Sequence, residues 1–150
     1  MDDHNQGHSS KRTDHGQNRT PFVWSDASLR LIFENSADAI LLIDDGLIFD
    51  CNHAAIEMLR YGRREALLSR PTSELSPDVQ PDGSSSSAKL AEVVATAFLK
   101  GSKRFEWTAK RSDNTQFPAE VLLTSIPFED RHILHAVFRD ISRRKEAERE

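Results

Sequence analysis

Residues 39–49 read AILLIDDGLIF, and this short stretch decides the fold. Two apolar runs, at 39–43 and 47–49, flank the sequence DDG at 44–46. An Asp-Gly pair between apolar runs is the strongest short-range signal of a β-hairpin, because both residues accept the backbone angles of a tight turn. We therefore expect a buried hairpin near the start of the folded part of the chain.

A helix is expected on either side of this hairpin. Before it, Ser25 or Asp26 can cap a helix over residues 26–35. The apolar residues of this segment recur at the spacing of one helical face, at Leu29, Ile32 and Phe33. After the hairpin, Asn52 can cap a second helix, which the pair YG at 61–62 is expected to end. A third short helix is expected over 64–68.

A loop and a longer helix follow. Residues 71–87 are rich in proline and serine, which favour turns over regular hydrogen bonding, so we expect a long loop. Residues 88–100 have the clearest helical pattern of the chain, and Gly101 is expected to end that helix. Its apolar face comprises Leu90, Val93, Val94, Ala97 and Phe98.

Three strand-like runs complete the folded part, at 104–111, 116–126 and 132–139. Short polar segments separate them, and this spacing predicts an antiparallel meander. Pro118 has no amide hydrogen, so we expect it near a strand start or with the missing donor turned away from the neighbouring strand. The sequence thus predicts five strands, two in the hairpin and three in the meander.

The ends of the chain differ in composition from this core. Residues 1–24 are mostly polar, and such a segment cannot bury enough apolar surface to offset its ordering entropy. Residues 141–150 read ISRRKEAERE, which is helical in propensity and almost wholly charged. The expected division is a disordered tail over 1–24, a domain over 25–140 and the start of a linker helix over 141–150.

Composition argues against several classes of function. The net charge of −4 creates no field that would attract nucleic acid. No apolar run approaches the roughly 20 residues that a membrane helix needs. The single cysteine, Cys51, cannot form an internal disulfide, which agrees with a reducing compartment. We expect a cytoplasmic protein that neither binds nucleic acid nor inserts into a membrane.

Several phrases of the sequence resemble the PAS family of sensory modules. Residues 31–40, LIFENSADAI, look like the opening of such modules. The sequence DDG at 44–46, together with DCNHAA at 50–55, looks like their hairpin turn and the start of the helix that follows it. Residues 139–148, RDISRRKEAE, are similar to the ending that joins them to effector domains in bacterial signalling proteins. The resemblance covers about 29–150. It implies an α+β fold, a five-stranded antiparallel sheet flanked by short helices on one face, with a ligand cavity between the sheet and the helices.

The identity of any cofactor stays open. Cys51 precedes Asn52 at a strand end, whereas flavin photosensors of the LOV type carry Asn-Cys-Arg on a central helix, so an FMN adduct is disfavoured. Residues 88–100 contain no His, Cys or Met to ligate haem iron, which disfavours haem. Phe105 and Trp107 could line a site for FAD or a small apolar ligand, although aromatic residues of this kind also pack in cores and dimer faces.

Metal and catalytic sites are not expected. His132 and His135 are three residues apart on an expected strand, which places them on opposite faces of the sheet, where they cannot chelate one metal ion together. The sequence has no glycine-rich phosphate loop and no nucleophile motif. We therefore expect no metal site and no catalytic residue.

The candidate site is an apolar wall and a separate transmission element. We expect the wall on the apolar face of the long helix and the inner face of the sheet, as core residues first and ligand contacts second. These candidates are Ile56, Leu59, Val94, Phe98, Trp107, Val121 and Leu123. The transmission element is expected where the last strand becomes a helix, and Asp140 can pair there with a basic residue of the core. Its residues are Arg139, Asp140, Ile141 and Ser142.

Two hypotheses of function follow. In the first, a non-catalytic sensory and dimerising module binds a small ligand or cofactor and signals to an effector in the same polypeptide, of the histidine kinase or diguanylate cyclase type. In the second, a ligand-free scaffold serves only for homodimerisation or partner binding, through helix 26–35 and the outer face of the sheet. An empty, fully packed core would favour the second hypothesis.

Overall fold

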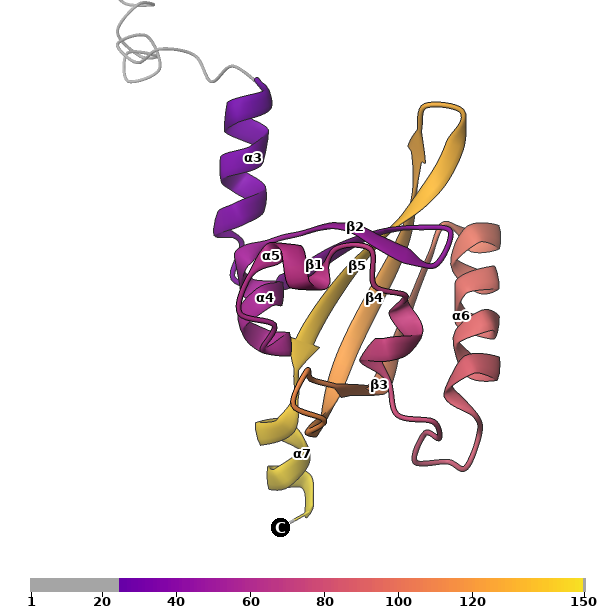
Figure 1. Cartoon of the computed structure of the whole chain (residues 1–150). Helices are drawn as coiled ribbons and strands as arrows, with labels where there is room; N and C mark the ends of the chain where they lie inside the picture. The colour runs from indigo at the N-terminus through magenta and orange to yellow at the C-terminus, as the bar shows by residue number, and fades with distance from the viewer. Residues whose placement is uncertain (1–24, 150) are drawn as a thin grey trace, which may run out of the picture. The chain divides into compact units, whose positions relative to one another are not determined.

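The structure, a computed structural model, describes residues 25–149 (Figure 1). Within these residues the chain divides into two units, with the boundary between Leu31 and Ile32. The helix α3 (Asp26–Asn35) begins in the first unit and ends in the second. Ser25 is its cap, because the Ser25 hydroxyl accepts from the amide of Ser28 at 3.1 Å. The tail expected over 1–24 lies outside the described residues.

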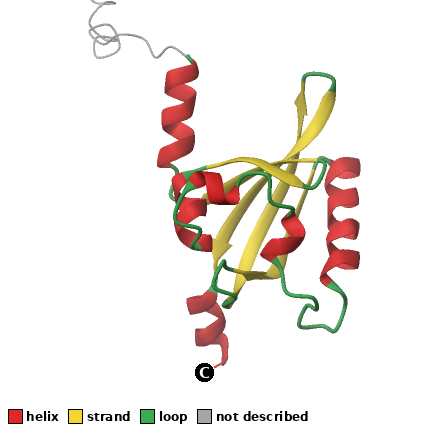
Figure 2. Ribbon diagram, viewed as in Figure 1, coloured by secondary structure: helices red, strands yellow, loops and turns green. Residues whose placement is uncertain are grey.

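The second unit contains a five-stranded antiparallel sheet in the order β2-β1-β5-β4-β3, which confirms the expected fold class. Figure 2 shows the sheet in yellow with the helices in red. In chain order its elements are β1 (Ala39–Asp44), β2 (Leu47–Cys51), α4 (His53–Leu59), α5 (Arg64–Leu67), the 3-10 helix η1 (Thr72–Leu75), α6 (Ser86–Lys100), β3 (Ser102–Lys110), β4 (Gln116–Phe128), β5 (Arg131–Asp140) and α7 (Ser142–Arg149).

The expected hairpin is present at β1 and β2. Asp45 and Gly46 both take positive φ angles, 53° and 78°, as a tight two-residue turn requires. The register shifts between Leu42 and Ile43, which leaves Phe49 as the extra residue of a β-bulge. The hairpin therefore forms one edge of the sheet, and β1 pairs on its other side with β5.

One buried cluster joins the helices to the inner face of the sheet. Directly paired strand residues share a face, so Phe105, Val121 and Phe138 form one inward row across β3, β4 and β5. The helices contribute their buried side chains to the same cluster, among them Ala55 and Leu59 of α4 and Val93 and Ala97 of α6. The opposite, outer face carries the half-buried side chains of Leu42, Leu122 and Val137.

The loop expected over 71–87 is shorter and more ordered than the sequence predicts. It contains η1, and α6 begins two residues before the expected start, because the Ser85 hydroxyl accepts from the amide of Ala88 at 3.0 Å. The serines of this segment therefore signal a helix cap as well as a turn. The end of α4 also differs, since Arg60, with φ of 60°, takes the left-handed position expected of Gly62.

Pro118 lies near the start of β4, as expected. Its carbonyl accepts from the amide of Ile141 at 3.0 Å, just beyond the end of β5. Because the N and C=O of a residue in an antiparallel pair face the same neighbour, the missing donor of Pro118 also faces Ile141. The carbonyl of Ile141 accepts instead from the amide of Lys145 at 2.9 Å, which is the first hydrogen bond of α7.

Among the described residues, no helix is both long and apolar enough to span a membrane.

Candidate functional site: an apolar cavity and a strand-to-helix junction

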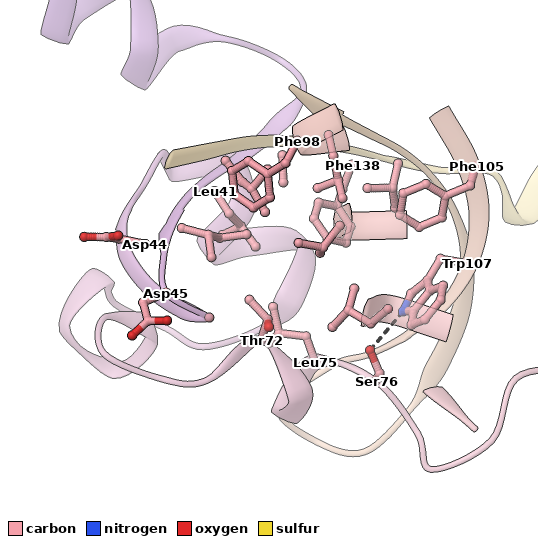
Figure 3. A pocket seen from close by; sticks show the side chains of 18 of the residues that line it. Leu41, Asp44, Asp45, Thr72, Leu75, Ser76, Phe98, Phe105, Trp107 and Phe138 are labelled. Atoms are coloured by element: carbon pink, nitrogen blue, oxygen red, sulfur yellow. Dashed lines mark hydrogen bonds between the residues drawn. The ribbon is translucent and has the colours of Figure 1, made fainter. Parts of the chain in front are cut away.

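A cavity of about 490 Å³ lies between the inner face of the sheet and the helices (Figure 3). Ligand sites in proteins commonly measure about 300–1,000 Å³ and are lined mainly by apolar side chains with a few polar groups. Most of the lining here is aliphatic or aromatic. It comes from β1, η1, α6 and the three strands of the meander. In size and chemistry, this cavity matches a site for a small molecule.

Five of the seven residues expected in an apolar wall line this cavity, namely Val94, Phe98, Trp107, Val121 and Leu123. The other two, Ile56 and Leu59, are buried in the core cluster but do not line the cavity. The apolar pattern of the α4 sequence correctly predicts which face of the helix is buried. Tertiary packing decides that this face contacts the core and not the cavity. The floor of the cavity is formed by η1, with Thr72, Leu75 and the following Ser76.

The aromatic wall is formed by β3. Phe105 and Trp107 are two residues apart on this strand, so both point inward. Their rings meet edge to face, with centroids 5.7 Å apart and an interplanar angle of 86°. The indole nitrogen of Trp107 donates a hydrogen bond to the hydroxyl oxygen of Ser76 at 2.8 Å, and both side chains are buried.

Charged groups gather at the exposed side of the cavity. Asp44 and Asp45 lie at the β1–β2 turn, and Arg131 and His132 begin β5. Arg131 and Asp44 form an ion pair with an N–O distance of 2.9 Å. Figure 3 places Asp44 and Asp45 on the side opposite Trp107 and Ser76. The charged part of the lining is therefore at the β1–β2 turn, and the part near Trp107 is mainly apolar.

The described residues contain no cluster of three His, Cys, Asp or Glu side chains that could hold a metal ion. Cys51 is buried at the end of β2 and does not line the cavity. His132 lines the cavity, whereas His135 pairs with Leu42 and Thr124 on the outer face. Burial lowers the pKa of His135 below its ordinary value, which favours the neutral imidazole.

The strand-to-helix junction is held by the side chain of Asp140. One carboxylate oxygen accepts from the amide and the hydroxyl of Ser142, at 2.9 and 2.5 Å, and so caps the start of α7. The other oxygen pairs with the guanidinium of Arg111 at 3.1 Å. Ile141 is buried, and Arg139 pairs with Asp38 at 3.4 Å.

Arg111 is the basic partner of Asp140, and the sequence alone did not single it out. Its Nε donates to the carbonyl of Met58 in α4 at 3.0 Å, and its guanidinium lies 4.0 Å from the ring centroid of Phe117. The side chain is only 13% exposed. Arg111 therefore connects the helical layer, the sheet and the start of α7.

A second contact joins α7 to β3. Glu106 pairs with Arg144 at 2.6 Å and with Lys145 at 2.7 Å. The hydrogen bond from Lys145 is the main reason that the pKa of Glu106 lies below its ordinary value. Glu106 stands between Phe105 and Trp107, so one strand directs two side chains into the cavity and one onto the outgoing helix.

Comparison with known proteins identifies the class to which this sheet and cavity belong. A family model described as PAS domain matches residues 37–143, which is more than half of the chain. The chain belongs to the PAS family, whose members are sensory modules. No curated protein matches the chain in sequence.

Solved structures of low sequence identity share the fold. The PAS domain of a protein from Colwellia psychrerythraea is 21% identical with a TM-score of 0.68, and the match covers 78% of this chain and 97% of that one. The PAS domain, in complex with ethanol, of a LuxR-family transcriptional regulator from Burkholderia thailandensis is 20% identical, with a TM-score of 0.60 and coverage of 75% and 96%. A domain of a sensory box sensor histidine kinase/response regulator from Geobacter sulfurreducens is 23% identical, with a TM-score of 0.58 and coverage of 74% and 90%.

Proposed function

We propose that this PAS module binds a small ligand in the cavity and passes a conformational signal through α7 to an effector domain. The observation that carries the proposal is the apolar cavity of about 490 Å³, whose wall strand β3 also contacts α7. A related fold whose structure contains ethanol supports a small-molecule ligand. A related fold from a sensor histidine kinase supports an effector of that type, with a diguanylate cyclase as the other candidate.

The signal would travel through the sheet. A ligand that contacts Phe105 and Trp107 biases the position of β3, and Glu106 on the same strand carries that change to Arg144 and Lys145. A ligand shifts such an equilibrium only by its differential affinity for the two arrangements. The contacts of α7 are exposed ion pairs, which contribute little energy each, so α7 can exchange between arrangements without unfolding the core.

The cavity is tested by filling it. Val121 points into the cavity from β4, and its neighbour Leu122 points to the outer face. Native mass spectrometry of freshly purified protein should show a bound small molecule, and an absorption spectrum should show whether that molecule is a flavin or a haem. Val121→Phe should remove the bound mass because the larger side chain occupies the space, whereas Leu122→Phe should retain it.

Two results would contradict ligand binding. One is the absence of any bound mass in the unmodified protein together with no response to an added library of small molecules. The other is equal retention of ligand by the Val121→Phe and Leu122→Phe variants.

A second candidate function is homodimerisation, which the exposed apolar surfaces favour. Leu29 and Ile32 of α3 are each about half exposed, at 49% and 51%. The outer face of the sheet separately presents Leu42, Leu122 and Val137. Apolar side chains gathered on a surface commonly mark a protein interface.

Light scattering after size-exclusion chromatography tests dimerisation. We expect a mass of two 17.0 kDa chains. Leu29→Glu with Ile32→Glu, or Leu122→Glu alone, should give the monomer mass if the altered surface is the interface. Leu99→Glu, a change at an exposed position on α6 outside the cavity, serves as the control and should leave the dimer intact. A monomer mass for the unmodified chain at high concentration would contradict dimerisation.

A further inference from the structure

We infer that the ligand of this cavity is an uncharged, largely apolar molecule that carries a hydrogen-bond acceptor, and that the hydroxyl of Ser76 binds this acceptor. The inference rests on the proposed function, because it names the class of ligand for the same cavity. A ketone, a quinone, an ester or an unprotonated ring nitrogen presents an acceptor of this kind.

The hydroxyl of Ser76 is a donor that the protein leaves free. Ser76 is 8% exposed and lines the cavity. Its oxygen accepts from the Trp107 indole at 2.8 Å, and a serine hydroxyl also carries one hydrogen to donate. No group among residues 25–149 accepts that hydrogen. Its hydrogen is therefore available to a hydrogen-bond acceptor of a ligand that enters the cavity.

The bond from Trp107 also orients the hydroxyl. An oxygen that accepts at one lone pair must direct its own hydrogen elsewhere, and the indole blocks the direction toward β3. Figure 3 shows Ser76 and Trp107 together on one wall, with the bond between them drawn as a dashed line. Since the indole hydrogen is already used, Trp107 offers the ligand its ring and no donor.

The surroundings of Ser76 favour an uncharged ligand. The inner wall is aliphatic and aromatic, with Leu75, Val121, Leu123, Leu134, Ala136 and Phe138. The charged lining residues lie on the opposite side, where Arg131 is already paired with Asp44. A charged group placed beside Ser76 would lose its hydration without gaining a counter-ion, which is costly.

Three fluorinated probes of similar size separate these chemistries. They are 4-fluoroacetophenone, which carries a carbonyl acceptor, 1-ethyl-4-fluorobenzene, which has none, and 4-fluorobenzoate, which is charged. Ligand-observed fluorine NMR gives a dissociation constant for each probe with any variant of the chain. We expect the ketone to bind about three- to tenfold more tightly than the hydrocarbon, as one hydrogen bond provides. The benzoate should bind most weakly.

The role of Ser76 requires a matched set of variants. Ser76→Ala alone would free the indole hydrogen of Trp107, which could then bind the ketone. The test therefore compares Trp107→Phe with the double variant Ser76→Ala/Trp107→Phe. The first should keep the preference for the ketone, and the second should lose it. Ser73→Ala, an exposed serine of the same 3-10 helix, is the control and should keep the preference.

The outcomes distinguish this inference from the proposed function. Equal binding of ketone and hydrocarbon, tighter binding of the benzoate, or a ketone preference that survives in the double variant would overturn the inference and leave ligand binding in place. Binding of none of the three probes, by a protein with an intact thermal unfolding transition, would overturn both.

Discussion

At the scale of single residues, Asn52 connects three segments of the second unit. Its side-chain oxygen accepts from the amides of Ile40 and Ala55, at 2.9 and 3.1 Å. Its side-chain nitrogen donates to the carbonyls of Asp38 and Phe33, at 2.9 and 3.1 Å. The side chain is fully buried and all four of these hydrogen bonds are satisfied. Asn52 thus holds the last turn of α3, the start of β1 and the start of α4 together.

Replacement of Asn52 should destabilise the fold strongly. Asn52→Ala leaves two buried amides and two carbonyls without these partners, so we expect a loss of about 3–5 kcal/mol in the free energy of unfolding. Urea unfolding followed by circular dichroism measures the change. His53→Ala, at the exposed neighbouring position, is the control and should change stability by less than about 0.5 kcal/mol. A loss below about 1 kcal/mol for Asn52→Ala would contradict this account.

At the scale of elements, contacts with β3 and β4 set the start and the position of α7. Pro118 has no amide hydrogen to donate to the carbonyl of Ile141. That carbonyl accepts instead from the amide of Lys145, which forms the first hydrogen bond of the helix. Glu106 then holds the helix by its ion pairs with Arg144 and Lys145. The position of α7 depends on two neighbouring strands, and both of them line the cavity.

The ion pairs of Glu106 should slow the opening of α7. In Glu106→Gln, we expect the amides of α7 to exchange with solvent about two- to fivefold faster, the range that exposed ion pairs provide. Hydrogen exchange followed by NMR measures this effect. Glu74→Gln removes a comparable exposed pair, with Arg70 at 2.6 Å, and should leave α7 unchanged. An equal effect in both variants would show that Glu106 has no specific role.

The same contact should depend on pH. The lowered pKa of Glu106 means that its pairing favours the ionised carboxylate, so the contribution is complete above the ordinary pKa of 4.5. It is lost as the pH falls through the lowered pKa. An NMR titration from about pH 6 to about pH 3 should show the Glu106 carboxyl titrating below its ordinary value, while the Cα shifts of α7 lose helical character in step. A Glu106 pKa at or above 4.5 would contradict the pairing.

At the scale of the whole molecule, Arg111 and Asp140 join the core to the segment that leaves it. Arg111 contacts α4 through the carbonyl of Met58 and contacts β4 through the ring of Phe117. Asp140 pairs with Arg111 and also accepts a hydrogen bond from the amide of Ser142, so a shift of Arg111 would displace the first turn of α7. A change in the sheet can therefore reach α7 at both Asp140 and Glu106.

Replacement of Asp140 should separate the core from its output. Under the proposed function, Asp140→Ala should abolish the response of the effector to the ligand. The isolated chain should retain its sheet by circular dichroism and its ligand by native mass spectrometry. Asp113→Ala, which removes an exposed partner of Arg60, is the control and should preserve the response. An unchanged response in Asp140→Ala would exclude this route of transmission.

The sequence by itself determined the elements and the fold class, because their signals are local. The turn at 44–46, the cap at Asn52, the apolar face of α6 and the three alternating strands each depend on residues within a few positions of one another. Together they predict five antiparallel strands and the helices between them.

Only the tertiary structure decided which side chains meet. Ile56 and Leu59 have the same pattern as the residues of the cavity wall, yet packing directs them into the core. Ser76, Arg111 and Glu106 gain their roles from Trp107, Asp140 and Arg144 of α7, which lie 31, 29 and 38 residues away along the chain. Such contacts depend on strand register and on the path of the connecting segments, which no local pattern of residues encodes.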